Sequence, residues 1–368
     1  MDSMIQKAFE KTFEQTNLTQ NFDAQKIEEE FGIDFHQARI CVIGTGGAGN
    51  NTITTLTEMG IEGAQTIAIN TDAKHLSITK ADKKLLIGKE TTRGLGAGGY
   101  PGIGRKAAEE SKKEIRQLLE GADMVFITCG LGGGTGTGSA PVIAEIAKSM
   151  GAIVIGAVTM PFKMEGTRIH KAEEGLMELR KVSDTVIVIE NQKLLQYAGD
   201  LPLKQAFAVA DELISTMIKG ITETITQPSL VNLDYADVKA IMHSGGVAAI
   251  GVGEADSSNR AREAIEKALK HPLLEMEVSG ANGAIVQIIG GEDLKLDEIN
   301  IIGETVYKRM NPEAQVIWGA RVLPEYNGKI QVITIITGVK SPYILGPVQR
   351  ENLGAEQRVP DLGIPLIS

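Results

Sequence analysis

The fold of this chain is decided by residues 130–138, which read GLGGGTGTG. An apolar run of strand length, Met124–Cys129, precedes them, and a helical pattern containing Pro141 follows them, a residue typical of a first helical turn. A flexible linker would not lie between a buried strand and a helix. Glycines let several backbone N–H groups approach an anion, and a helix start adds partial positive charge. The stretch therefore predicts a phosphate site, with Thr135 and Thr137 as extra hydroxyl donors.

Composition limits the class of protein. With 368 residues, 42% of them hydrophobic and 23% charged, the chain is long enough for two globular domains. A net charge of −10 argues against a nucleic-acid partner. Cys41 and Cys129 lie in strand-like runs and read as buried, reduced residues. No apolar run approaches the roughly 20 residues of a membrane span, and no signal peptide is evident. We therefore expect a cytoplasmic protein without direct membrane insertion.

Two more glycine loops follow strand-like runs. Residues 44–50 read GTGGAGN and formally match G-x-G-x-x-G, which by itself would indicate a dinucleotide enzyme. A further loop at residues 94–99 leads into an expected amphipathic helix at 102–119. Runs that are apolar on both faces alternate with helices, which predicts a doubly wound parallel α/β sheet with the glycine loops at its carboxyl edge. The expected strands are 39–43, 65–69, 85–87, 124–129, 153–158 and 185–189.

The second half of the chain has a different pattern of expected helices and strands. Residues 203–226 form the longest uninterrupted helical pattern, and a smaller α+β region follows it. Its expected strands are 247–252, 284–289, 315–318 and 330–336, with helices at 259–270 and 296–310. The predicted organisation is an N-terminal extension (1–37), an α/β domain with the three glycine loops (38–202), a central helix (203–226), a C-terminal α+β domain (227–340) and a flexible tail (341–368).

The three glycine loops, the long helix and the run Asn232-Leu-Asp234-Tyr-Ala-Asp237 resemble the FtsZ family, the prokaryotic tubulin homologues that build the division ring. The resemblance spans residues 38 to 340, and GGGTGTG at 132–138 is the family signature. The long N-terminal extension is similar to that of archaeal members. The resemblance implies a cytoskeletal GTPase that polymerises head to tail at the division site, with GTP or GDP and Mg²⁺ bound and with the active site completed by the adjacent subunit. It assigns no metal ligand.

The resemblance also implies site residues. The phosphate side comprises three glycine loops, a turn between them, and a Glu–Arg pair. These are Gly46, Gly47 and Asn50; Asp72 and Ala73; Gly96, Ala97 and Gly98; Gly132, Gly133, Gly134, Thr135, Gly136, Thr137 and Gly138; and Glu165 with Arg168. The guanine set is Asn191, Phe207 and Asp211, and the catalytic set, acting on a neighbour's nucleotide, is Asn232, Asp234 and Asp237. Two departures from the family pattern are Arg168, three rather than four residues after Glu165, and Tyr100, where a small polar residue is more usual.

Chemistry supports two of these assignments, although each also has a simpler alternative interpretation. Guanine presents two adjacent donors, and Asp211 offers two acceptors, although a solvated helix charge would look the same in sequence. From Asp211 to Thr226 is about 15 helical steps or roughly 22 Å, so Asp234 lies beyond the far end of the helix from the base site. Asp234 and Asp237 could then polarise water and help hold Mg²⁺ in another subunit, or they could simply cap the next helix.

Alternatives and partners complete the interpretation. A nicotinamide-dependent oxidoreductase needs one glycine fingerprint rather than three, and the five histidines form no catalytic motif. No G-x-x-x-x-G-K-[ST] occurs, which excludes a conventional P-loop GTPase. Within the tubulin superfamily, a CetZ-like cell-shape protein is the alternative. Residues 361–365, DLGIP, resemble the family's tail peptide, so segment 359–367 is expected either to dock membrane tethers or division proteins, or to be an unstructured end.

Overall fold

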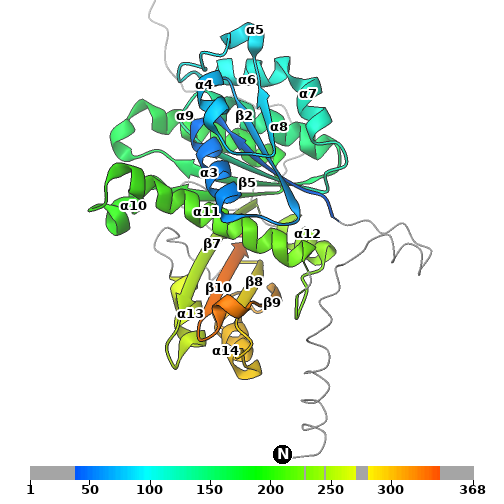
Figure 1. Cartoon of the computed structure of the whole chain (residues 1–368), viewed down its shortest axis with the longest axis vertical. Coiled ribbons are helices and arrows are strands. Elements are labelled where there is room, and N and C mark those ends of the chain that lie inside the picture. Colours follow the sequence, from blue (N-terminus) through cyan, green and yellow to red (C-terminus); the bar gives the residue numbers. More distant parts are fainter. Residues whose placement is uncertain (1–37, 228, 244–245, 271–280, 340–368) are drawn as a thin grey trace, which may run out of the picture. The chain divides into compact units, whose positions relative to one another are not determined.

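Ten strands form one continuous sheet in the order β3-β2-β1-β4-β5-β6-β7-β10-β8-β9 (Figure 1). The structure is a computed structural model and describes residues 38–339 apart from 228, 244–245 and 271–280. The predicted N-terminal extension and the tail, including segment 359–367, lie outside the described residues. The strands are β1 Ile40–Thr45, β2 Ala64–Asn70, β3 Lys83–Leu86, β4 Met124–Gly130, β5 Ile153–Met160, β6 Thr185–Glu190, β7 Gly246–Ala255, β8 Gly283–Gly290, β9 Gln315–Val322 and β10 Ile330–Thr337.

The first six strands are all parallel to their neighbours, as the sequence predicted for a doubly wound α/β sheet. Crossover helices join them: α3 Gly46–Met59, α4 Ala73–Ile78, α5 Lys89–Thr92, α6 Pro101–Glu110, α7 Lys112–Leu118, α8 Thr135–Ser149 and α9 Thr167–Val182. Because a parallel sheet is covered on both faces, successive residues of one strand enter different cores. In β1, Cys41 and Ile43 join one apolar cluster, and Ile40 and Val42 join the other.

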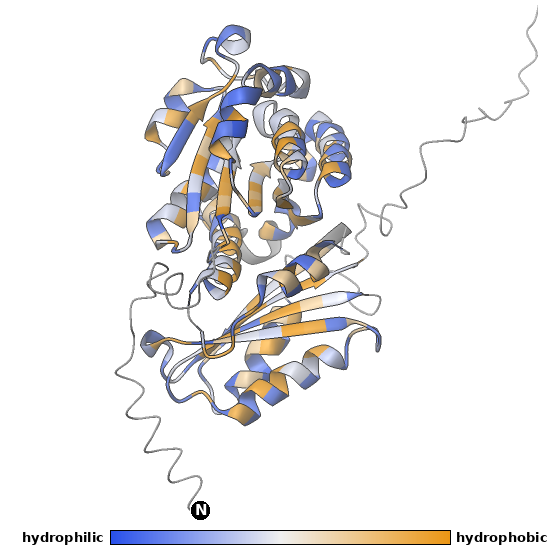
Figure 2. Ribbon diagram, turned by 90° about the vertical axis from the view of Figure 1, so that its right-hand side faces the viewer, coloured by the Kyte–Doolittle hydropathy of each residue, from blue (hydrophilic) through white to orange (hydrophobic). Residues whose placement is uncertain are grey.

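The two clusters define two helical layers. Apolar residues of α8 and α9 pack on one face of the sheet, whereas those of α3 and the long helix α11 Leu203–Thr226 pack on the other. Figure 2 shows apolar residues concentrated along the strands and banded along the helices, as one-sided burial requires. Helix α11 has α10 Asn191–Ala198 near one end and α12 Tyr235–His243 near the other (Figure 1). The predicted central helix is confirmed.

Strand β7 extends the sheet beside β6, through three parallel residue pairs. Strand β10 then runs antiparallel to both β7 and β8, and β9 is parallel to β8. Helices α13 Arg260–Leu269 and α14 Leu296–Tyr307 contribute to the same apolar cluster as α8. All four strands and both helices expected in this half are present. Among the described residues, no helix combines the length and the apolar composition needed to cross a bilayer.

Helix boundaries differ from the sequence prediction in three places. Residues 46–50 and 135–138 were expected to be loop, but they are the first turns of α3 and α8. Pro141 consequently lies inside α8 rather than in its first turn, where it leaves the Thr137 carbonyl without an N–H partner in the helix. The single helix expected at 102–119 is interrupted at Ser111, whose φ of −98° and ψ of 20° separate α6 from α7.

Candidate nucleotide-binding site

Two helices begin side by side at the carboxyl edge of the sheet. Helix α3 follows β1 and helix α8 follows β4, and these two strands are neighbours. Neither helix start has a side-chain cap, so the N–H groups of both first turns are available to a ligand. The starts are in backbone contact, since a Cβ added to Gly46 would lie 2.8 Å from the nitrogen of Gly136. Two uncapped N-termini in contact form a strong anion site.

Hydrogen bonds of two threonine hydroxyls hold the turn between β4 and α8 in place. The hydroxyl of Thr137, which is buried, accepts a hydrogen bond of 2.9 Å from the Gly132 nitrogen. The hydroxyl of Thr135 lies 2.6 Å from that of Thr71, at the end of β2. Gly133 faces open space, because a Cβ there would meet no atom within 4 Å. The loop therefore presents a clear backbone surface beside the two helix starts, and Thr137 supports it. This loop and the first turns of α3 and α8 together form a candidate phosphate surface.

The loop at 94–99 closes a second side of this surface. Gly94, Gly96, Gly98 and Gly99 all have positive φ, a conformation that glycine adopts without strain. The loop is tied to the end of β2 by hydrogen bonds from the Gly96 nitrogen to the Thr71 carbonyl, 3.1 Å, and from the Ala73 nitrogen to the Gly94 carbonyl, 3.0 Å. It also touches the turn between β4 and α8 (residues 131–134, the central loop), since a Cβ on Gly134 would come within 2.8 Å of the Ala97 Cβ.

Two predicted phosphate-side residues are engaged with the protein itself. Asn50 is fully buried, and with its amide nitrogen facing inward it donates to the Gly44 carbonyl at 2.8 Å. Asp72 caps α4 by accepting from the nitrogens of Lys74 and His75 at 2.9 and 3.1 Å. Gly47 lies on the exposed side of α3, and a Cβ there would meet nothing within 4 Å. The open glycines are thus Gly47 and Gly133, and Asn50 and Asp72 hold the loops in shape.

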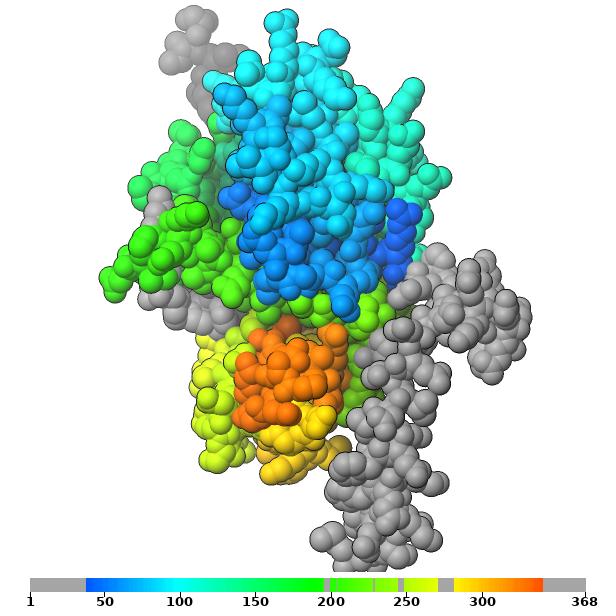
Figure 3. Space-filling view, viewed as in Figure 1, coloured from blue at the N-terminus to red at the C-terminus, as the bar shows by residue number. Residues whose placement is uncertain are grey.

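The predicted guanine set gathers where α11 meets α3 and α10. Asp211 accepts a hydrogen bond of 2.7 Å from the hydroxyl of Thr52 on α3. Burial raises the pKa of Asp211 to about 6, and the Thr52 hydrogen bond opposes that rise. Asn191, the first residue of α10, is buried, and its Oδ1 has no hydrogen-bond partner among the described residues. Figure 3 shows the segment around α3 and the segment around α10 and α11 meeting at the surface.

An aromatic pair lies at the same end of α11. The ring of Phe207 meets the ring of Phe162 edge to face, with centroids 5.7 Å apart and an interplanar angle of 68°. Phe207 is also 39% exposed, so one of its surfaces is available to a flat ligand. A buried acceptor, a desolvated carboxylate and an exposed ring are the features that a guanine base would use, and the residues present fit that base.

Glu165 ends a 3-10 turn, Lys163–Glu165, just before α9, and Arg168 lies in the first turn of α9, next to the central loop. Arg168 donates to Glu165 at 2.6 Å, and the other oxygen of Glu165 accepts from the Phe162 nitrogen at 2.9 Å. A Cβ on Gly132 would lie 2.8 Å from the Arg168 carbonyl. The Arg168 side chain is 56% exposed and sits on a helix that contacts the central loop.

The predicted catalytic set lies apart from these residues, after the far end of α11. Asn232, Asp234 and Asp237 are all exposed. Asp234 accepts from the Ala236 nitrogen at 2.9 Å, so it caps α12, and Asp237 lies in the first turn of that helix. Within the part of the chain that the structure describes, no three His, Cys, Asp or Glu residues cluster as a metal site would require.

Sequence reasoning missed several residues that shape the site. Thr52, Phe162 and Thr71 each contact a predicted residue, yet none belongs to a glycine loop. Thr52 could have been noticed because it follows Ala48 by one helical turn, on the helix that the first glycine loop begins. Phe162 gave no comparable signal, because its partner is far away in sequence.

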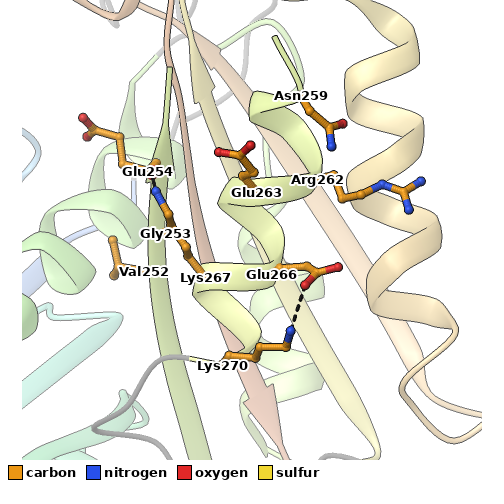
Figure 4. Close-up of a pocket in the computed structure, with 9 residues that line it drawn as sticks. All are labelled: Val252, Gly253, Glu254, Asn259, Arg262, Glu263, Glu266, Lys267 and Lys270. Atoms are coloured by element: carbon orange, nitrogen blue, oxygen red, sulfur yellow. Dashed lines mark hydrogen bonds and ion pairs between the residues drawn. The ribbon is translucent and has the colours of Figure 1, made fainter. Parts of the chain in front are cut away.

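A separate hollow of about 780 Å³ lies between β7 and α13 (Figure 4). Three acidic and three basic side chains line it, so their formal charges balance. Lys270 pairs with Glu266 at 2.8 Å, and Lys267 donates to the Glu254 carbonyl at 2.8 Å. Because these charges are already balanced, the hollow favours no particular ligand.

Family models match both halves of the chain. The GTPase domain of the Tubulin/FtsZ family matches residues 39–199, and the C-terminal domain of the FtsZ family matches residues 246–340. Cell division protein FtsZ 2 of Methanocaldococcus jannaschii is 57% identical over 332 residues, which covers 89% of this chain and 86% of that protein. Cell division protein FtsZ 1 of Thermococcus kodakarensis is 52% identical over 364 residues, or 96% of this chain and 97% of that protein.

Solved structures agree with these matches. An empty FtsZ dimer from M. jannaschii is similar with a TM-score of 0.81 and 49% identity, covering 91% of this chain and 99% of that one. CetZ2 from Haloferax volcanii, solved as a GTPgS-bound protofilament, has a TM-score of 0.70 over 82% of this chain and 93% of that one, but only 23% identity, so it shares the fold alone. The FtsZ interpretation is favoured over the CetZ-like and the oxidoreductase alternatives. The chain belongs to the FtsZ family of tubulin-like GTPases.

Proposed function

We propose that this protein binds and hydrolyses GTP and polymerises head to tail into filaments of the cell-division ring. The observation that carries the proposal is the pairing of two uncapped helix starts with a desolvated carboxylate on α11, since one anion site and one guanine site fit a single nucleotide. The names of the relatives, cell division proteins and an FtsZ dimer, agree with it.

Base recognition rests on the three residues of the guanine set. Asp211 accepts from the two adjacent donors of guanine, which adenine does not offer. Phe207 packs against the base plane, and the unpartnered oxygen of Asn191 accepts one further donor. Thr52 keeps the carboxylate of Asp211 turned toward the ligand.

Phosphate binding rests on the backbone. The first turns of α3 and α8, with Gly46, Gly47 and Gly132–Gly138, direct N–H groups at the phosphates, and the loop containing Gly96, Ala97 and Gly98 closes over them. Ala73 ties that loop to β2, and Glu165 positions the exposed Arg168 near the central loop. Mg²⁺ would neutralise phosphate charge, and Mg²⁺ commonly takes most of its ligands from phosphate and water.

Hydrolysis is completed by the next subunit. Asn232, Asp234 and Asp237 lie beyond the end of α11 that is distant from Asp211, roughly 22 Å of helix away, so they do not reach the nucleotide of their own subunit. In a head-to-tail filament this end faces the nucleotide of the neighbour. There, Asp234 and Asp237 orient and polarise the attacking water, and Asn232 shapes the loop by accepting from the Ser229 nitrogen at 2.8 Å.

Two further parts of the proposal concern organisation and partners. We divide the chain into an extension (1–37), a GTP-binding domain (38–202), the central helix (203–226), a C-terminal domain (227–340) and a tail (341–368). The tail segment 359–367 would connect the filament to a membrane tether or to division proteins, which would place the protein at the division site.

The rate of GTP hydrolysis, measured against protein concentration, tests the proposal. A shared active site predicts almost no turnover at low concentration and a steeper than linear rise once filaments form. Light scattering should increase over the same range with GTP and not with GDP. A turnover rate per subunit that stays constant on dilution would contradict the proposal. Light scattering that rises equally with GTP and GDP would contradict it as well.

A further inference from the structure

One face of α9 runs along the central loop and α8. Arg168 and Gly175 are seven residues apart on this face. The backbone of Arg168 packs on Gly132, and Gly175 packs on Thr137, where an added Cβ would lie 2.4 Å from the threonine methyl. Lys171, three residues after Arg168, shares the face. Helix α9 is therefore in direct contact with the phosphate surface, and Lys171 extends from the middle of that contact.

Lys171 bonds to the loop on the opposite side of the central loop. Its ammonium donates to the Gly99 carbonyl at 2.8 Å and lies 5.3 Å from the ring centroid of Tyr100. A cation over an aromatic face is favourable, and a charged donor strengthens a hydrogen bond. Tyr100 is 63% exposed, so Lys171 gives an otherwise solvated residue a fixed partner. The residue at position 100 that departs from the family pattern thus has a local role here.

The loop has two ends, and different elements hold them. Its first end is bonded through Gly94 and Gly96 to Ala73 and Thr71, in the segment that follows β2. Its second end contains Gly98 and Gly99, both with positive φ, and it receives the Lys171 bond. Consecutive glycines are the most freely moving backbone in a chain, so a tie at Gly99 restrains the part of the loop that most needs restraint.

The topology indicates which part of a nucleotide the loop would meet. Asn191 follows β6, and Asp211 lies on α11, whereas the loop is bonded to the end of β2, on the other side of β4 and β1. A nucleotide whose base lies at Asp211 and whose phosphates cross the starts of α8 and α3 extends its last phosphate toward this loop. Lys171 also adds a positive charge at that edge.

We propose that Lys171 is a positioning residue that clamps the 94–99 loop, through Gly99 and Tyr100, against the terminal phosphate of the nucleotide. This inference rests on the proposed function and names a determinant of GTP over GDP preference within the same site. Preorganising a loop improves the binding of the ligand that contacts it, and leaves a shorter ligand largely unaffected.

The test compares the affinities of GTPgS and GDP for the full-length Lys171→Ala variant, measured by calorimetry below the assembly concentration. We expect affinity for GTPgS to fall by about tenfold and affinity for GDP by less than about twofold. Lys171→Arg, which keeps the cation and the donor, should restore most of the preference. Tyr100→Phe, which keeps the ring, should behave like wild type, and Tyr100→Leu should reproduce part of the loss.

Lys181→Ala is the matched control, because it removes the same charge from an exposed position near the other end of α9. Equal losses of GTPgS and GDP affinity in Lys171→Ala would indicate a merely structural role and would overturn the inference. Unchanged affinity for GTPgS would overturn it as well. Wild-type protein that binds neither nucleotide would instead contradict the proposed function, and the clamp with it.

Discussion

Thr52 and Asp211 are joined by a hydrogen bond of 2.7 Å between residues 159 positions apart in the chain. The bond links α3, whose first turn belongs to the proposed phosphate site, to α11, which carries the carboxylate proposed to bind guanine. Helix α3 thus contacts both ends of the proposed nucleotide site. Movement of α3 upon phosphate binding would directly shift the carboxylate of Asp211.

Replacing Asp211 tests base recognition. Asp211→Ala leaves two guanine donors unsatisfied, and affinity for GTP should fall by about 10- to 100-fold. Asp211→Asn offers one acceptor and one donor, which matches xanthine better than guanine, so this variant should gain affinity for XTP. Competition binding with GTP and XTP measures both effects. Wild-type GTP affinity in Asp211→Ala would show that the base binds elsewhere.

The raised pKa of Asp211 predicts a pH dependence. Since guanine recognition needs the carboxylate, lowering the pH from 7.5 to 5 should weaken GTP binding by about tenfold through this group. Asp211→Asn, in which nothing titrates at this position, controls for the triphosphate. The free energy of unfolding should change in the opposite direction and increase as the pH is lowered. A pKa of about 6 in the folded state exceeds the ordinary 3.8, so the contribution of this group is full below pH 3.8 and is lost as pH rises through 6.

Gly133→Val separates binding from folding. Its Cβ would meet no protein atom, so the melting temperature should stay within about 2 °C of wild type. The side chain would nevertheless occupy the space beside the helix starts, and GTP binding should be abolished. Gly134→Val is the contrast, because its Cβ would lie 2.9 Å from the Tyr100 nitrogen, and it should destabilise the protein. GTP binding by a folded Gly133→Val protein at wild-type strength would contradict the phosphate assignment.

Asp234 needs a pair of variants, because it both caps α12 and is proposed to act on a neighbour. Asp234→Ala removes the cap as well as the charge, and it should cost about 0.5–2 kcal/mol of stability. Asp234→Asn keeps a capping oxygen and loses only the charge. If the residue is catalytic, both variants should bind GTP and assemble but hydrolyse slowly, and each should poison turnover when mixed with wild type. Normal hydrolysis in Asp234→Asn would leave capping as its only role.

Much of this fold could be predicted because its signals are local. Apolar runs and glycine loops predicted every strand of the parallel half, and the length of α11 was evident from its pattern. The exact helix starts at Gly46 and Thr135 could not be predicted, because glycine and threonine favour loops in isolation. Here the preceding parallel strands and the packing of α3 against α8 extend the helices into the glycine runs.

Only those residues of the candidate site that belong to sequence motifs could be predicted. The clamp by Lys171 and the bond from Thr52 join residues 72 and 159 positions apart, and no periodicity or motif connects them. The family resemblance implied a phosphate-side role for Asp72, and in the structure its carboxylate caps α4. A polar residue after a strand can serve a ligand or a helix end, and only the tertiary geometry separates the two uses.

Strand β6 pairs with β5 on one side and with β7 on the other. A chain cut after α11 would therefore leave Thr185–Ile187 as an unprotected apolar edge, of the kind that recruits strands from other molecules. One apolar cluster, moreover, contains residues from both β1 and β10. The two halves should accordingly fold and melt together. A protease nick between them would yield fragments that stay associated, and either half produced alone should aggregate.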